Sequence, residues 1–191
     1  MELSVRSDTV SSAGRAAHDV ALAALLGGNL FGRTAMHPAL AEVNDKAERG
    51  RVLNRAWRRY GTVNSAALAT LVAGWLPARL NETHPRWLSP RERRLARAKD
   101  IAIGGVVVTG LASAAGGVGF AHQAQDGAVP MQSGTETAPE APPRAAALKR
   151  AVNALGALNI ASELALVGVN AALAQTNFRR PPARRLLRRR Y

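Results

Sequence analysis

Residues 151–175, AVNALGALNIASELALVGVNAALAQ, place one carboxylate and a few amides in a run made mainly of Ala, Leu, Val and Gly. Asn159 and Glu163 are four positions apart and Asn170 is seven further on, so on a helix the three side chains share one face. About 20 apolar residues cross the roughly 30 Å hydrocarbon core of a bilayer. The stretch is therefore predicted to be a membrane-spanning helix with Glu163 near its middle.

Charge is segregated along the rest of the chain, which has 26 Lys or Arg, 13 Asp or Glu and a net charge of +13. No Lys, Arg, Asp or Glu occurs in 20–32, 60–78 or 101–125. This segregation predicts an all-α fold, a four-helix transmembrane bundle in residues 16–176. The expected parts are a polar N-terminal tail (1–15), spans at about 17–37, 60–78, 100–122 and 150–176, a disordered, flexible loop (123–149) and an Arg-rich C-terminal tail (177–191).

Two other interpretations of these runs stay open. A soluble four-helix bundle would bury them, but its helices would carry large apolar residues at about three positions in seven. These segments are instead rich in Ala and Gly on every side, and only 4% of the chain is aromatic. The first run could also be a signal peptide cleaved after residues 39–41, although a long, partly acidic stretch precedes it.

The distribution of Lys and Arg predicts an orientation in a bacterial plasma (inner) membrane. Seven Lys or Arg lie in 79–99 and seven in 177–191, against two in 123–149, so both termini are expected in the cytoplasm. The connection 38–59 conflicts with this orientation, because it carries six and would lie outside.

Two explanations of the conflict are possible. The connection is expected to be an interfacial amphipathic helix, with Leu53, Trp57 and Tyr60 towards lipid and arginines towards the headgroups. Trp75, at the other end of the second span, would then belong to a second aromatic belt. Alternatively, the first segment does not span and the N-terminus lies outside.

Glu163 is the strongest candidate for a functional residue. A lone carboxylate at mid-membrane depth is expensive, so it should face the bundle interior and be paired or hydrogen-bonded. Spans one and four run in opposite directions, which brings Asn29 and Arg33 near the depth of Asn159 and Glu163. The sequence predicts a buried polar cluster of these four, with Asn170 further along the same face. Such a cluster either holds two spans together or forms a proton-relay or substrate site.

No cofactor is expected. The chain has no Cys, which excludes disulfides and zinc-thiolate sites. His37 and His122 close the first and third spans on one predicted side and are the candidates for a haem or metal site. Neither belongs to a closely spaced metal motif. No G-x-S-x-G elbow is present, so no catalytic residue is assigned.

The expected partners are lipids and other helices. Small residues four apart in the third span suit close helix approach, within the bundle or in a homo- or hetero-oligomer. These pairs are Ala112 with Gly116, Ser113 with Gly117 and Ala115 with Gly119. The Arg runs suit anionic headgroups. They would also attract nucleic-acid phosphates, but no recognition motif accompanies them, so no specific nucleic acid is expected.

Two segments carry a resemblance to a known group: GGNLFGRTAMHPAL (27–40) and RGRVLNRAWRRYGTVNSAALAT (49–70). Over roughly the first 120 residues the chain resembles small four-span integral membrane proteins of actinobacteria, of uncharacterised function and loosely anthrone-oxygenase-like. The resemblance implies fold and location, and matches no catalytic residue. We therefore expect a non-catalytic membrane scaffold or accessory subunit. The alternative is a small membrane enzyme or carrier that uses the cluster around Glu163 on a lipophilic or protonatable substrate.

Overall fold

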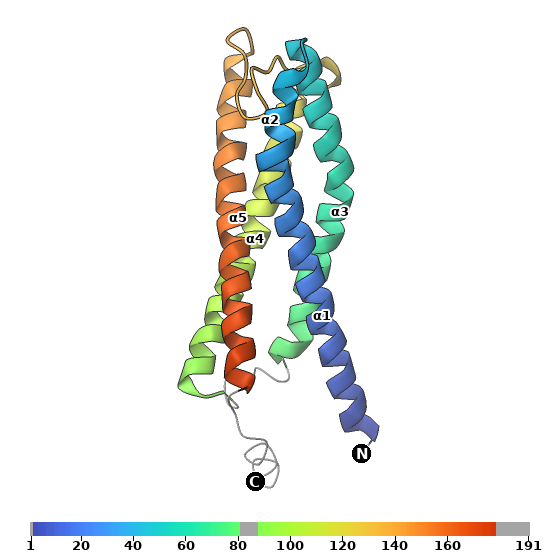
Figure 1. Cartoon of the computed structure of the whole chain (residues 1–191), viewed down its shortest axis with the longest axis vertical. Helices are drawn as coiled ribbons and strands as arrows, with labels where there is room; N and C mark the ends of the chain where they lie inside the picture. Colours follow the sequence, from blue (N-terminus) through green and yellow to red (C-terminus); the bar gives the residue numbers. More distant parts are fainter. Residues whose placement is uncertain (1, 81–87, 179–191) are drawn as a thin grey trace.

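The computed structural model describes residues 2–80 and 88–178 and is almost entirely helical (Figure 1). Within these ranges the all-α prediction is confirmed, since β structure is limited to one bridge between Met131 and Thr137. The predicted C-terminal tail lies outside the described residues beyond position 178. The elements are α1 (Glu2–Phe31), a π turn η1 (Gly32–Met36), α2 (His37–Ala39), η2 (Leu40–Glu42), α3 (Lys46–Leu80), α4 (Pro90–Ala121), η4 (Gln125–Gly127) and α5 (Pro143–Phe178).

The four long helices run further than the predicted spans. α1 begins at Glu2 rather than after a tail, and α3 begins at Lys46 and continues through the second predicted span. α4 begins at a capping box, in which the Ser89 hydroxyl accepts from the Glu92 amide and the Glu92 carboxylate accepts from the Ser89 amide. The bundle is therefore longer than a bilayer core, and polar turns of each helix extend beyond its apolar part.

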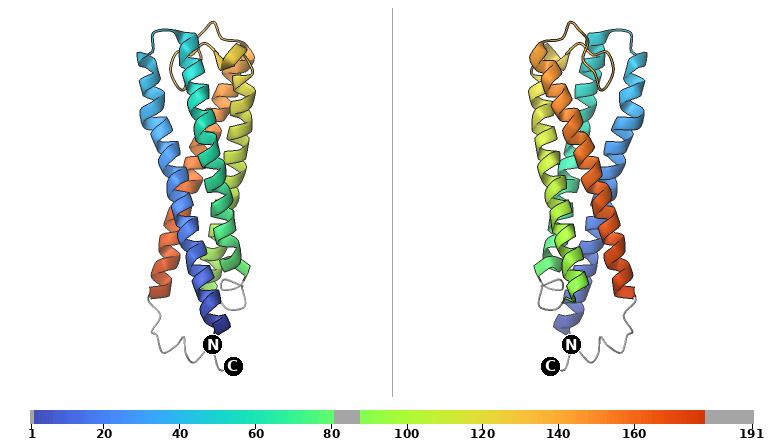
Figure 2. Two further views of the ribbon diagram at one scale, coloured as in Figure 1. Left: turned by 90° about the vertical axis from the view of Figure 1, so that its right-hand side faces the viewer. Right: turned by 90° about the vertical axis from the view of Figure 1, so that its left-hand side faces the viewer.

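The helices pair as two antiparallel hairpins, α1 with α3 and α4 with α5 (Figures 1 and 2). In the first pair Gly28 lies against the Tyr60 ring, and the Tyr60 hydroxyl donates to the Ala24 carbonyl at 2.8 Å. In the α4–α5 hairpin, Gly116 and Gly119 face α5, whereas Gly117 faces open space. All three glycines belong to the small-residue pairs predicted from the sequence. Small residues thus set the close approach of helices within the bundle.

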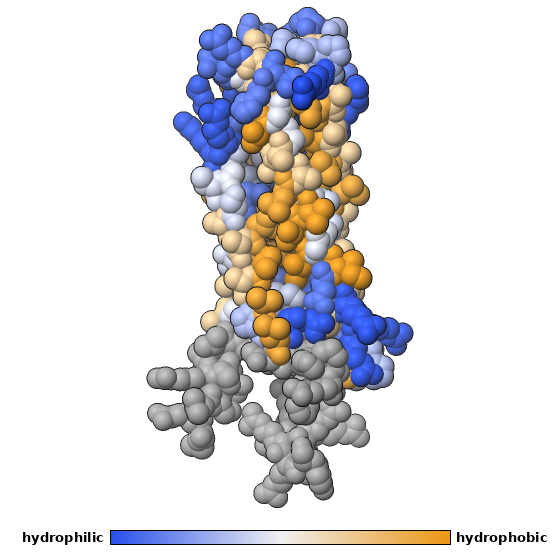
Figure 3. Space-filling model, turned by 180° about the vertical axis from the view of Figure 1, so that it is seen from behind, coloured by the Kyte–Doolittle hydropathy of each residue, from blue (hydrophilic) through white to orange (hydrophobic). Residues whose placement is uncertain are grey.

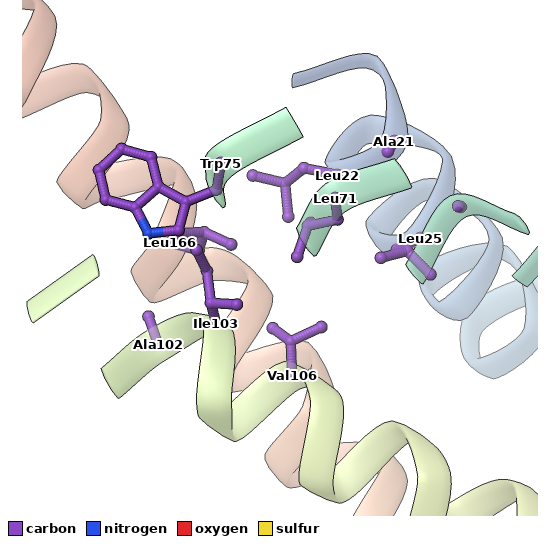
Figure 4. Packing of buried hydrophobic residues seen from close by; sticks show 10 residues of the cluster. Ala21, Leu22, Leu25, Leu71, Trp75, Ala102, Ile103, Val106 and Leu166 are labelled. Atoms are coloured by element: carbon purple, nitrogen blue, oxygen red, sulfur yellow. The ribbon is translucent and has the colours of Figure 1, made fainter. Parts of the chain in front are cut away.

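One apolar cluster joins all four helices in the half of the bundle where α3 ends (Figure 4). Leu25 from α1, Leu71 from α3, Val106 from α4 and Leu166 from α5 are each at most 1% exposed. Because every helix contributes, removing one of these side chains would leave a cavity shared by both hairpins.

Residues 122–142 form a packed cap over the other end of the bundle, so the prediction of a disordered loop is wrong. Val129 and Met131 are completely buried. The Met131 amide donates to the Lys46 carbonyl at 2.9 Å, and the Gly134 amide donates to the His37 carbonyl at 3.2 Å. These two buried apolar side chains and the backbone hydrogen bonds to the first turn of α3 and to α2 keep the segment ordered. Its composition, which includes Pro and Ser, had indicated a flexible loop.

Two basic residues of the 38–59 segment hold the cap in place. The Arg49 guanidinium donates to the carbonyls of Val43 (2.6 Å), Gln132 (2.6 Å) and Ala41 (3.0 Å). The Lys46 ammonium donates to Glu140 at 2.9 Å, and this hydrogen bond lowers the pKa of the Glu140 carboxyl.

The predicted interfacial helix is not separate, because residues 46–59 are the first part of α3. Leu53 is only 1% exposed and packs under the cap, and Trp57 and Tyr60 face α1 rather than lipid. Trp75 is also turned inward, at 8% exposure. The aromatic side chains expected at the membrane surface instead fill the interface between helices.

On the face of the bundle seen in Figure 3, apolar side chains cover the middle and polar side chains lie towards the ends. We call this apolar middle part of the surface the belt. α4 and α5 are long and apolar enough to cross a membrane, and only 17% of the most apolar window of each is buried. Their outward side chains include Ile101, Val108, Leu111, Val118, Leu158 and Leu164, each 53–76% exposed. Soluble proteins rarely expose contiguous apolar surface on this scale.

Candidate functional site

Glu163 is completely buried at the centre of the bundle, as its sequence context predicts. Its Oε1 accepts two hydrogen bonds, from Asn29 Nδ2 at 2.8 Å and from Asn159 Nδ2 at 2.9 Å. Asn29 belongs to α1 and Asn159 to α5, so a single carboxyl oxygen links two helices that pair with different partners. Of the predicted cluster, these three residues come together.

Thr109 extends this cluster to α4, a connection that the sequence interpretation missed. Its hydroxyl lies 2.8 Å from Asn159 Oδ1 and 2.6 Å from the Gly105 carbonyl. Thr109 sits in an uncharged apolar run where a hydroxyl that bonds its own helix is ordinary. The sequence feature that could have predicted this contact is Gly105, one turn before Thr109. It allows α5 to approach closely, since a Cβ there would meet Ser162 Oγ at 2.8 Å.

The second oxygen of Glu163, Oε2, is buried and has no hydrogen-bond partner among the described residues. A buried polar atom without a partner costs free energy, so such atoms often mark a proton, a ligand or a strained contact. The cluster can therefore serve as a polar link between helices, and it has one acceptor left over for a proton or a donor group.

Arg33 and Asn170 do not join the cluster. Arg33 is exposed, so its predicted burial is wrong. It lies in the π turn Gly32–Met36, where the wider i→i+5 pattern rotates side chains away from the positions of a regular α-helix. The Asn170 amide instead donates to Asp19 of α1 at 3.0 Å, further towards the helix ends.

A second polar cluster, absent from the sequence interpretation, lies where α3 ends and α4 begins. Trp75 Nε1 donates to Asp100 Oδ1 at 3.0 Å, and Arg79 Nε donates to Asp100 Oδ2 at 2.9 Å. Lys99 Nζ, in a side chain only 6% exposed, lies 4.0 Å from the centre of the Trp75 ring. His18 Nδ1 is 2.7 Å from the Leu71 carbonyl and donates to it. The cluster ties α1, α3 and α4 together by hydrogen bonds and a cation–π contact.

The two histidine candidates have different surroundings. His37 Nε2 accepts from Trp57 Nε1 at 3.2 Å, and its Nδ1 is buried with no hydrogen-bond partner among the described residues. His122 is exposed at the C-terminal end of α4. Over the described ranges, no group of three or more His, Asp or Glu side chains is placed to share a metal ion.

Two neighbouring pockets open at the cap end, away from Glu163. One has a volume of about 300 Å³ and is lined by Arg58, Val118, His122 and Asp126, among others. The other, of about 180 Å³, is lined by Arg51, Arg55, Arg58 and Asp126. Three arginines on one side of α3 make these pockets suitable for an anion.

No protein-family model matches the chain, and neither the curated proteins nor the solved structures contain a significant match.

Proposed function

We propose that the chain is an integral membrane protein in which all four long helices cross the bilayer. α1 and α3 lack an uninterrupted stretch as apolar as those of α4 and α5, yet they also turn large apolar side chains outward, including Val20, Phe31, Val63 and Leu76 at 51–70% exposure. Polar turns at both ends of the bundle suit the headgroup regions. The resemblance to small actinobacterial membrane proteins stays a prediction.

The proposed orientation places both termini in the cytoplasm. Support comes from the seven Lys and Arg of 79–99, whereas the six basic residues of 38–59 at the opposite end count against it. Of the six basic residues in 38–59, Arg49 holds cap carbonyls, Lys46 pairs with Glu140 and Arg51 pairs with Glu48. All six still count against this orientation, because the bias concerns Lys and Arg and not net charge, but three of them have structural partners at this end of the bundle.

We propose a non-catalytic role, as a scaffold or accessory subunit. The observation that carries this proposal is the complete burial of Glu163, whose hydrogen bonds connect α1 and α5 and, through Asn159 and Thr109, α4. A polar group used in this way specifies how helices pack in lipid. Gly104, Gly117 and Gly156 have open space where a side chain would be, so a helix of a partner or a second copy could approach closely there.

A second candidate, a small membrane enzyme or carrier, rests on the unpartnered Oε2 of Glu163. In that case a proton or a donor group of a lipophilic substrate would reach Oε2 from one side of the membrane. The two proposals differ in one measurable property, which is whether water reaches Glu163.

Carbodiimide modification of the protein in proteoliposomes distinguishes the two. A scaffold predicts that a water-soluble carbodiimide leaves Glu163 unmodified at any pH, while Glu140 in the exposed cap is modified under the same conditions. A carrier predicts modification of Glu163 that a Glu163→Gln variant lacks. Peptide mass spectrometry identifies the modified residue, and modification of Glu163 at the rate of Glu140 would refute the scaffold proposal.

A further inference from the structure

We propose that the paired pockets at the cap end bind the headgroup of an anionic phospholipid. This inference rests on the proposed membrane location, and it names a ligand class and a site that the scaffold role does not require. The phosphate would lie between Arg55 and Arg58, and the acyl chains would run down the apolar surface of α4.

The first observation is the placement of the arginines. Arg51, Arg55 and Arg58 follow an i, i+4, i+7 spacing on α3, which puts them on one face of the helix. All three line the 180 Å³ pocket, and Arg58 also lines the 300 Å³ pocket. Arg51 is paired with Glu48, whereas Arg55 and Arg58 are exposed and have no carboxylate partner among the described residues. Two guanidinium groups are thus available for a phosphate.

The second observation is the position of the pockets relative to the apolar belt. One wall of the larger pocket is Val118, which is 58% exposed and belongs to the belt. Arg58 and His122 form its polar wall, at the level where α4 ends. The pocket therefore lies between apolar side-chain surface and polar side chains. A phospholipid has the same two-part chemistry, and a soluble anion does not.

The third observation is the left-handed backbone conformation of Asp126. Asp126, which lines both pockets, has a φ of 54°, and Gly127 has a φ of 69°. The Asn54 amide donates to the Gly127 carbonyl at 2.7 Å and fixes this turn against α3. A non-glycine residue with positive φ costs free energy and is often found at binding sites.

The charge of the site decides which lipid it favours. Asp126 is the only carboxylate that lines the two pockets, and it faces three arginines. After the pairing of Arg51 with Glu48, the lining keeps a net positive charge. Phosphatidylglycerol, whose phosphate is negative and whose glycerol hydroxyls can donate to Asp126, fits this charge. Phosphatidylethanolamine, which has no net charge, is the matched comparison.

Native mass spectrometry of the detergent-solubilised full chain tests the proposal, with phosphatidylglycerol and phosphatidylethanolamine added separately. We expect at least about ten-fold tighter binding of phosphatidylglycerol. Loss of one arginine near anionic lipid weakens binding about five-fold, so Arg55→Ala/Arg58→Ala should weaken it about 25-fold. Arg58→Lys should retain most of the binding, because it keeps the charge.

Arg59→Ala is the control, since Arg59 neighbours Arg58 but lines neither pocket. It should change binding less than two-fold. Any one of three results would overturn the proposal. These are equal binding of the two lipids, a loss of lipid binding in Arg59→Ala as large as in the single variant Arg58→Ala, and displacement of the lipid by millimolar inorganic phosphate. A chain that inserts into membranes but fails this test refutes only the lipid site, whereas a chain that stays in the soluble fraction refutes the membrane location itself.

Discussion

Replacing Glu163 by Leu removes the one acceptor shared by two amide groups. The Nδ2 donors of Asn29 and Asn159 lie 2.8 and 2.9 Å from Glu163 Oε1, and both would lose this partner. The bond from Asn29 joins α1 to α5, and hydrogen bonds between membrane helices contribute on average about 0.6 kcal/mol and at most about 1.7 kcal/mol each. The bond from Asn159 lies within α5, and its loss leaves a second buried amide without its partner, which adds to the cost. We therefore expect Glu163→Leu to lower the free energy of unfolding by roughly 1–3 kcal/mol.

Reversible unfolding in mixed detergent and SDS micelles, followed by circular dichroism, measures this change. Glu163→Gln is the matched control, because its amide oxygen still accepts from both asparagines, and it should cost less than half as much as Leu. The triple variant Asn29→Leu/Asn159→Leu/Glu163→Leu should regain part of the loss, since no amide donor is then left unpaired. A Leu variant as stable as the parent, or a Gln variant as unstable as the Leu variant, would refute the role assigned to Oε1.

Two further predictions concern helix pairing and the cap. Gly28→Ala should destabilise the protein by about 1–3 kcal/mol, because its Cβ would overlap the Tyr60 ring; Gly27→Ala, which meets no atom within 4 Å, should be neutral, and equal effects in thermal unfolding would contradict this packing. Since the hydrogen bond from Lys46 lowers the pKa of Glu140, this pair stabilises the cap at neutral pH, and the stabilisation disappears as the pH falls through that lowered pKa. Melting curves from pH 7 to pH 3 should therefore lose part of their pH dependence in Glu140→Gln, and an unchanged profile would show that the pair contributes nothing.

The centre of the site was predictable because two simple rules determine it. A solitary carboxylate in an apolar helix turns inward, and the 1.5 Å rise per residue places antiparallel helices at comparable depths. Together they locate Asn29 and Asn159 beside Glu163. The same rules fail at Arg33, because they assume a regular α-helix, and the π turn after Phe31 changes the direction of the side chains.

The cap and the second polar cluster were not predictable from composition. Residues 123–149 contain four Pro and several small or polar residues, as a linker would, and their order depends on two buried side chains, Val129 and Met131, that contact other helices. Trp75 has the position of a membrane-surface aromatic, but Asp100, 25 residues away, turns it inward by accepting its indole hydrogen bond. Such long-range partners leave no periodic signal in the sequence.

The central claim is that lipid surrounds the apolar belt, and spin-label accessibility tests it most directly. The chain has no Cys, so a single introduced cysteine carries the label at one defined position. Val108 and Leu164 are outward-facing belt positions, and Arg59 and Arg93 are exposed beyond the belt. In reconstituted bilayers, labels at 108 and 164 should collide with molecular oxygen more than with a water-soluble nickel complex, and labels at 59 and 93 should show the reverse. Nickel accessibility at 108 and 164 equal to that at 59 and 93 would contradict the account.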